Sequence, residues 1–246
     1  MKKLIYYLLN YFSHNLENKI INILKNKKNI IIFDVGCFKG VFSRKILTLI
    51  KSKKFKFYLF DINKNVKKYV NDLLIHKDFA FHEVALSKKN GTAIYNYNRF
   101  FESSGSSLSP LFKNDRSWVL SRKILLKLFF QKTEGYIKYR VKTNTLDYFV
   151  KKNKIKLIDV LKVDIDGSEL DFLKGAKKTL KKNKVKVVLI EINDKKINFR
   201  NKTKKIINFF SEMNYVLIKR HMNHSVGFLS NAKSGDFLFV NKVTKT

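Results

Sequence analysis

Residues 29–40, which read NIIIFDVGCFKG, decide the fold class of this chain. A short apolar, β-branched run ends in Asp34 and Val35, and Gly36 and Gly40 follow in the turn. Such a run is typical of a strand buried on both faces of a parallel sheet. Glycines after a strand let the backbone turn tightly and approach a ligand closely. Their spacing differs from G-x-G-x-x-G and no Walker lysine follows, which disfavours a dinucleotide or a nucleoside triphosphate.

Outward from this stretch, short apolar runs alternate with helical patterns. This order predicts an α/β fold built of βαβ units around a mostly parallel sheet. We expect strands at 29–35, 55–60, 79–86, 92–97, 136–141, 157–163, 185–192, 215–219 and 237–240, and helices at 41–49, 63–74, 118–130, 168–180 and 203–213. The last two strands follow each other without a helix, which indicates an antiparallel hairpin at one edge of the sheet.

The 246 residues are enough to bury a core without disulfides, and 45% hydrophobic residues is a globular composition. The single cysteine, Cys37, excludes an intramolecular disulfide and a multi-cysteine zinc site. We predict an N-terminal helical extension at 1–28 and one domain at 29–246. Within this domain, residues 98–140 insert an irregular region that interrupts the alternation and that we assign to the acceptor.

The net charge of +33 would ordinarily indicate a nucleic acid or an anionic membrane as partner. However, only seven of the 52 basic residues are arginine, and lysine is accompanied by many Asn, Ile, Phe and Tyr residues, whose codons are AT-rich. Arginine makes the bidentate contacts with phosphate and guanine, and it is scarce here. We therefore interpret the charge as mainly compositional and do not expect a nucleic-acid partner.

The N-terminal apolar run, residues 4–12, is too short to span a bilayer, and no small-residue cleavage site follows it. Its apolar residues recur at helical spacing, so the segment can pack on a core: Ile5, Leu8, Leu9, Phe12 and Leu16. We expect a soluble, cytoplasmic protein. Peripheral contact with an anionic membrane at its inner face, through an interfacial helix, stays an alternative.

Carboxylates end two further predicted strands. Asp61 ends the second strand, the position where nucleoside-binding folds grip a ribose diol. Asp164 ends a buried apolar strand, where an unpaired charge would cost several kcal/mol, so it should face a ligand or a cation. Next to it, Asp166 and Glu169 have the spacing of a capping arrangement at a helix start.

Seven short motifs in register over residues 31–192 resemble the FkbM family of S-adenosylmethionine-dependent O-methyltransferases. They are Asp34-Val35-Gly36 with Gly40 and Ser43; Phe60-Asp61-Ile62-Asn63; Ala85-Leu86-Ser87 with Asn90-Gly91-Thr92; Thr145-Leu146-Asp147; the run from Leu161 to Glu169; Leu173-Lys174-Gly175-Ala176; and Glu191. The sequence departs from the family pattern at four places: Cys37-Phe38 replaces the usual Ala-Asn, Asp61 and Asp166 each replace the usual Glu, and Glu83 stands where Asn is more frequent.

This resemblance implies a Rossmann-like class I methyltransferase fold, with a seven-stranded sheet, helices on both faces and the cofactor S-adenosyl-L-methionine. It implies that the 34–40 loop holds the methionine part of the cofactor, that Asp61 holds the ribose, and that residues 82–85 line the adenine. Asp164 would lie beside the sulfonium and the acceptor, as a catalytic base or a cofactor anchor. The cofactor-binding residues expected on this basis are Asp34, Gly36, Gly40, Ser43, Asp61, Glu83 and Ala85.

The expected acceptor is the hydroxyl of a sugar, glycan or small metabolite, since family members act on such hydroxyls, often in surface polysaccharide pathways. We expect Ser106, Ser107 and Glu169 to bind it, because a long loop inside a regular alternation is usually functional. Two alternatives stay open: an RNA methyltransferase, although the Asn/Asp-Pro-Pro-aromatic signature is absent, and a membrane-associated binding module without chemistry.

We do not expect a metal site, although two arrangements have some features of one. His221 and His224 have a metal-like spacing but no carboxylate or cysteine partner nearby in the sequence. The other is an oxygen-ligand set that could gather round a divalent ion: Asp164, Asp166, Glu169 and Glu191.

Overall fold

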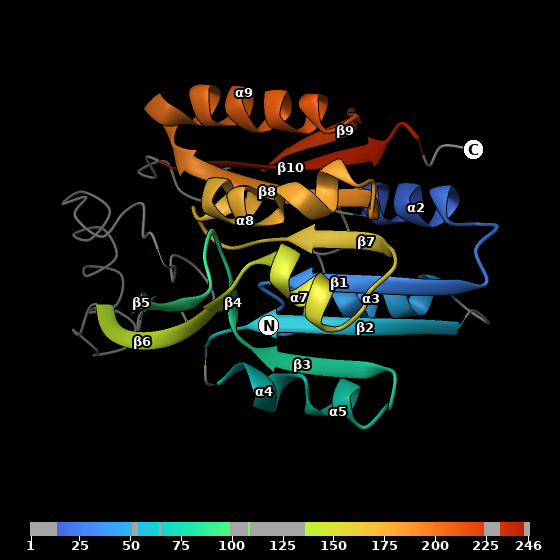
Figure 1. Ribbon diagram of the computed structural model, residues 1–246, viewed down its shortest axis with the longest axis horizontal. Coiled ribbons are helices and arrows are strands. Elements are labelled where there is room, and N and C mark those ends of the chain that lie inside the picture. Colours follow the sequence, from blue (N-terminus) through green and yellow to red (C-terminus); the bar gives the residue numbers. More distant parts are fainter. Residues whose placement is uncertain are drawn as a thin grey trace, which may run out of the picture.

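The computed structural model describes residues 14–50, 54–63, 65–98, 108, 136–223 and 232–243 (Figure 1). Its strands are β1 (Asn29–Val35), β2 (Lys54–Asp61), β3 (Phe79–Glu83), β4 (Ala85–Leu86), β5 (Gly91–Asn98), β6 (Tyr136–Asn144), β7 (Ile158–Val163), β8 (Val185–Lys195), β9 (Tyr215–Asn223) and β10 (Ala232–Asn241). Its helices are α2 (His14–Ile23), α3 (Val41–Leu49), α4 (Val66–Tyr69), α5 (Asn71–Leu74), α7 (Leu146–Lys152), α8 (Glu169–Lys181) and α9 (Lys196–Glu212).

Seven strands form the main sheet in the order β3-β2-β1-β7-β8-β10-β9. The first five strands in this order pair in parallel, and β10 pairs antiparallel with both β8 and β9. The predicted fold class, a mostly parallel sheet that ends in an antiparallel hairpin, is confirmed. The chain runs outward from β1 in both directions, so the strand order reverses between β1 and β7, which is where open α/β sheets bind ligands.

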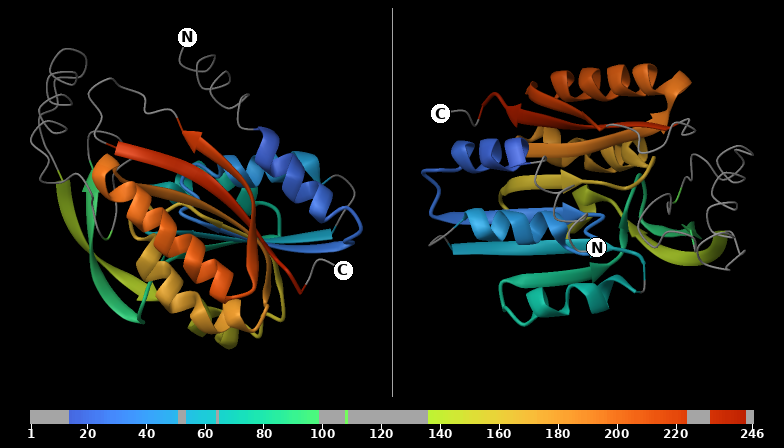
Figure 2. Two further views of the ribbon diagram at one scale, coloured as in Figure 1. Left: turned by 90° about the horizontal axis from the view of Figure 1, so that it is seen from above. Right: turned by 180° about the vertical axis from the view of Figure 1, so that it is seen from behind.

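Helices cover both faces of this sheet (Figure 2). One hydrophobic core lies between the sheet and α2, α3, α4 and α5, and a second lies between the sheet and α7, α8 and α9. Ile20 and Leu24, which belong to the predicted N-terminal extension, are fully buried in the first core. The part of the predicted extension that begins at His14 therefore packs on one face of the sheet, as part of the domain. Of the predicted N-terminal stripe, only Leu16 lies within the described residues, and it is buried.

Two predicted strands do not join the main sheet. The strands predicted at 92–97 and 136–141 form an antiparallel pair, β5 and β6, which with β4 makes a separate three-stranded sheet. In β5, Tyr95, Asn96 and Tyr97 are buried while Ile94 is exposed. The strand predicted at 79–86 is likewise divided at Val84, so that β3 and β4 lie in different sheets.

The helices also differ from the prediction in places. The helix predicted at 63–74 is two short helices, because Val70 leaves the helical region of φ/ψ space. Helix α9 begins at Lys196 rather than at 203. Helix α7 was not predicted, although Thr145 caps it with a side-chain oxygen that accepts from the Tyr148 backbone N–H at 3.0 Å. The helix predicted at 118–130, and most of the 98–140 insertion, lie outside the described residues.

Within the ranges that the structure describes, none of the helices is long and apolar enough to cross a membrane.

The small sheet is joined to the main layer by a close backbone approach at Gly175 of α8. A Cβ atom at this position would lie 2.0 Å from the carbonyl oxygen of Ser87, which follows β4. Only glycine lets the helix and the β4–β5 turn meet at this distance. The contact holds the β4 end of the small sheet against α8, close to the carboxyl ends of the main strands.

We expect Gly175→Ala to lower the free energy of unfolding by about 2–3 kcal/mol, because the added methyl group must displace backbone. Urea denaturation followed by circular dichroism would measure the change. Lys177→Ala, an exposed position on the same helix, is the matched control and should stay within about 0.5 kcal/mol of wild type. Equal stability of wild type and Gly175→Ala would contradict the close approach.

Candidate active site

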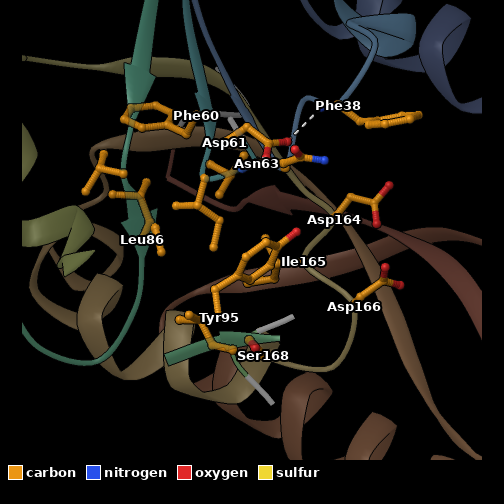
Figure 3. A pocket seen from close by; sticks show the side chains of 16 residues that line it. Phe38, Phe60, Asp61, Asn63, Leu86, Tyr95, Asp164, Ile165, Asp166 and Ser168 are labelled. Atoms are coloured by element: carbon orange, nitrogen blue, oxygen red, sulfur yellow. Dashed lines mark hydrogen bonds between the residues drawn. The ribbon is translucent and has the colours of Figure 1, made fainter. Parts of the chain in front are cut away.

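A pocket of about 330 Å³ opens at the carboxyl ends of the main strands (Figure 3). Residues that follow β1, β2 and β7 form much of its lining, and Val84 to Leu86, Tyr95 and Leu108 complete it. Figure 3 shows Asp61 and Asn63 across the pocket from Tyr95 and Ser168. The pocket therefore lies at the reversal of strand order, where the sequence places its glycines and strand-end carboxylates.

Gly36, in the turn after β1, lines this pocket with a φ of 80°. A Cβ atom there would lie 1.8 Å from the carbonyl oxygen of Asp164. The close approach that requires glycine is therefore to the neighbouring β7 turn, and contact of Gly36 with a cofactor stays a prediction. Gly40 does not line the pocket; its missing side chain makes room for Val70 and Leu73.

Asp34 and Ser43 form a buried pair behind the loop. The Ser43 Oγ donates to Asp34 Oδ2 at 2.6 Å, and neither residue lines the pocket. Burial raises the pKa of Asp34 to about 6, although the Ser43 hydrogen bond and the charge of Lys162 oppose the rise. Asp34 and Ser43, both predicted to bind the cofactor, thus stabilise the 34–40 loop from its buried side.

Asp61 lines the pocket at the end of β2 and also joins two turns. Its Oδ2 accepts from the Phe38 backbone N–H at 3.0 Å, and its Oδ1 accepts from the Asn63 N–H at 2.9 Å. Burial raises the pKa of Asp61, and these backbone donors oppose the rise. Since each carboxylate oxygen can accept a second hydrogen bond, Asp61 can also accept from both hydroxyls of a diol.

The segment predicted to line an adenine divides between two environments. Ala85 lines the pocket, whereas Glu83 is exposed and outside the lining. His82 stacks on Phe60 with ring centroids 5.2 Å apart, and burial lowers its pKa. Val84, which belongs to the predicted 82–85 segment, and Leu86, which follows that segment, also line the pocket.

Asp164 faces both the pocket and a cation, as its position at the end of a buried strand indicates. It lines the pocket, and its Oδ2 lies 3.4 Å from the Nζ of Lys162. Lys162 is buried and lies 3.7 Å from Asp236 as well. Burial alone lowers the pKa of Lys162, but the carboxylates around it raise that pKa above its ordinary value, so the ammonium stays charged. Sequence reasoning missed Lys162, whose signal is a lysine in a short buried strand that carries one other charged residue, Asp159.

Glu169 is not among the described residues that line the pocket, and its substrate-binding role stays a prediction. Its side chain is fully buried, its Oε2 lies 2.5 Å from Lys202 Nζ, and its Oε1 accepts from the Gly167 N–H at 2.9 Å. The N-cap of α8 is Ser168, two residues after Asp166. Asp166 lines the pocket with a φ of 42°, and its Oδ1 accepts from Asn193 Nδ2 at 3.1 Å.

Ser106 and Ser107 lie outside the described residues, so their contact with an acceptor stays a prediction. Among the residues that the structure does describe, no three His, Cys, Asp or Glu side chains are grouped to hold a metal ion. The oxygen-ligand set considered from the sequence is not assembled, because Glu169 is paired with Lys202. Of the two histidines with metal-like spacing, His224 lies outside the described ranges.

The Methyltransferase FkbM domain matches residues 34–217 of this chain. A curated relative, the 2-O-methyltransferase NoeI of Sinorhizobium fredii, is 25% identical over 192 residues, which cover 75% of this chain and 72% of NoeI.

Among solved structures, the FkbM methyltransferase from Methylobacillus flagellatus superposes with a TM-score of 0.52 at 12% identity. The superposition covers 85% of this chain but only 44% of that protein. A SAM-dependent methyltransferase assigned in Streptococcus mutans superposes with a TM-score of 0.50 at 8% identity, over 93% of this chain and 48% of the other. At these identities the structures show a shared fold.

Asp34 should make stability depend on pH in an identifiable way. Its pKa is raised from 3.8 to about 6, so between these values the folded protein holds a proton that the unfolded chain has lost. The stabilising contribution of protonated Asp34 to the free energy of unfolding therefore falls as the pH rises from about 4 to about 6, and it is absent above pH 6. Asp34→Asn cannot ionise. Between pH 4 and pH 7 its free energy of unfolding should therefore fall by about 2 kcal/mol less than that of wild type.

Urea denaturation at a series of pH values would measure the difference between the two proteins. Ser43→Ala keeps the Asp34 carboxylate but removes the hydroxyl that donates to it. The pKa of Asp34 should then rise further, and the loss of stability with rising pH should be larger than in wild type. Parallel curves for wild type and Asp34→Asn would show that the buried carboxylate does not titrate as described.

Proposed function

The chain belongs to the FkbM methyltransferase family, and we propose that it is an S-adenosylmethionine-dependent O-methyltransferase that acts on a hydroxyl of a sugar, glycan or small metabolite. The relative named a 2-O-methyltransferase supports an oxygen acceptor. A role in surface polysaccharide modification in the cytoplasm belongs to the same proposal. The observation that carries the proposal is the charge of the pocket.

The pocket is acidic in a strongly basic chain. Three of the 16 described residues that line it are Asp61, Asp164 and Asp166, and none of the 16 is Lys, Arg or His. The whole chain carries a net charge of +33. Carboxylates that line a cleft, with their compensating cations outside the lining, attract a positive ligand and repel phosphates. A ligand with a sulfonium and an ammonium group fits this arrangement, and a nucleoside triphosphate does not.

The residues present suit each part of S-adenosylmethionine. Asp61 can accept from the ribose hydroxyls, and the apolar surface of Val84 and Leu86 can cover the adenine. The bound cofactor would supply an electrophilic methyl group on a positively charged sulfur. The protein's part is to align the acceptor hydroxyl and to exclude water from its surroundings.

Asp164 is the carboxylate best placed to accept the proton of the acceptor hydroxyl. Its Oδ2 lies 3.4 Å from the Lys162 ammonium, and this contact holds the carboxylate in one orientation. Proton acceptance by a positioned carboxylate is general base catalysis. Asp164 can instead serve as an anchor for the cofactor's positive charge, and the two roles are separable by experiment.

Two other functions are less well supported. An RNA methyltransferase must bring a polyanion to the reaction site, and the described lining offers it no cation. A membrane-associated module without chemistry would not need the Asp61 and Asp164 arrangement. Peripheral contact with an anionic membrane remains compatible with the enzyme and forms a separate expectation.

We expect wild-type protein to bind S-adenosylmethionine in calorimetry and to show no binding of ATP at the same concentration. Asp61→Ala should weaken the affinity about 10- to 100-fold, because it removes the diol acceptor and the Phe38 contact. Asp61→Glu should keep most of the affinity. Asp72→Ala, an exposed carboxylate elsewhere on the fold, is the control and should bind as wild type.

Comparable affinities for ATP and S-adenosylmethionine would contradict the charge argument. No binding of S-adenosylmethionine by folded wild type would favour the module without chemistry.

Asp164→Asn should separate the two roles of this carboxylate. If Asp164 is the base, the release of S-adenosylhomocysteine with a methylated glycan acceptor should fall about 100-fold or more, while cofactor affinity changes less than about threefold. Turnover would be followed with a panel of neutral sugars and glycans. An equal loss of affinity and turnover would make Asp164 a cofactor anchor instead.

A further inference from the structure

Two lysines are buried among the residues that the structure describes, Lys162 and Lys202, in a chain with 45 lysines. They approach the loop from Asp164 to Glu169 from different elements, β7 and α9. Lys162 pairs with Asp164 at the start of this loop, and Lys202 pairs with Glu169 at its end. Four residues of the loop line the pocket. Burial of two lysines against a single loop calls for a physical reason, since lysine is almost never fully buried.

Lys202 makes three short polar contacts from helix α9. Its Nζ lies 2.5 Å from Glu169 Oε2, donates to the Asn193 carbonyl at 2.7 Å, and donates to the Gly167 carbonyl at 3.2 Å. The two carbonyls accept from two of the three donors of the ammonium, and the Glu169 carboxylate lies beside it as the counter-charge. The ammonium thereby connects α9, the end of β8 and the pocket loop.

These contacts extend to the pocket wall through two further hydrogen bonds. The Asn193 side chain donates to Asp166 Oδ1, and Glu169 Oε1 accepts from the Gly167 N–H. Asp166 and Gly167 have φ values of 42° and 101°. For Asp166 this backbone conformation is unfavourable, and it persists only where the surroundings determine it. The Lys202 contacts are those surroundings.

We propose that Lys202 is a positioning residue, which holds the loop from Asp164 to Glu169 in the conformation that presents Asp164 and Asp166 to the ligand. Lys202 does not line the pocket, so it acts through the loop and is not a catalytic residue. The identity of that ligand rests on the proposed function. The positioning itself rests on the contacts alone.

Stability by itself does not account for this lysine. A buried ion pair contributes little net stability, and apolar residues of similar size often replace one without loss. Breaking such a pair is costly, however, because the remaining carboxylate is left buried without a counter-charge. Glu169 would be left in this state, next to the Gly167 backbone that it orders.

The test compares Lys202→Met, which removes the charge, with Lys202→Arg, which keeps it, in the full-length chain. Lys205→Met, an exposed lysine on the same helix, is the matched control. Hydrogen exchange by mass spectrometry reads the order of the loop, and calorimetry with S-adenosylmethionine reads the pocket. Both are carried out well below the melting temperature of each variant.

Lys202→Met should raise exchange of the 164–169 segment about tenfold, with β1 and β2 unchanged, and weaken S-adenosylmethionine binding about tenfold. Lys202→Arg should restore both within about threefold, and Lys205→Met should behave as wild type. A lower melting temperature of Lys202→Met with unchanged loop exchange and affinity would overturn the proposal. Uniformly faster exchange over the whole sheet would overturn it too.

If Lys202→Met does not fold, Glu169→Gln removes the same ion pair while keeping an acceptor for the Gly167 N–H. Faster exchange confined to the 164–169 segment supports the proposal, and exchange equal to wild type refutes it. If wild type itself fails to bind S-adenosylmethionine, the proposed function fails, and the exchange measurements still decide whether Lys202 positions the loop.

Discussion

The site depends on the close approach of two backbone turns, one after β1 and one after β7. The Asp164 N–H donates to the Val35 carbonyl at 2.9 Å, and the Asp164 carbonyl occupies the space that a side chain at Gly36 would need. A third turn joins them, because Asp61 accepts from the Phe38 N–H. Three strand ends are thus joined by backbone contacts and by the Asp61 side chain, and each presents a pocket-lining residue. The geometry of the pocket follows from these contacts before any ligand enters.

Electrostatics gives this framework its chemical character. The chain carries a large excess of lysine, yet the described lining of its pocket has carboxylates and no cation. Buried charges are tolerated only where they are paired and hydrogen-bonded. Lys162 pairs with Asp164 and Lys202 pairs with Glu169, and both lysines lie outside the pocket lining. The acidic surface stays directed at the pocket because its compensating charges lie behind it.

One departure from the family pattern shows how the loop adapts. Phe38 stands where the resemblance leads us to expect Asn, and its φ of 41° lies in the left-handed region that Asn tolerates better. The ring packs against Tyr69, with centroids 5.9 Å apart, and lines the pocket. The Phe38 N–H to Asp61 hydrogen bond holds the turn in place. Packing and this bond together offset the unfavourable backbone conformation.

The sequence by itself determined the strands of the parallel sheet and the two carboxylates at their ends, since apolar runs and strand-terminal acids are local patterns. It also indicated the family through motifs in register. Only the tertiary structure decided that Gly36 faces Asp164, that Glu169 is bound by Lys202, and that β5 and β6 leave the main sheet. Glu169 has the spacing of a cap, and no local pattern reports a lysine 33 positions later in the chain. Such contacts depend on which elements pack against each other. Because the Glu169–Lys202 pair is buried, its interaction is stronger than that of a pair at the surface, and it can hold the loop of the site in place.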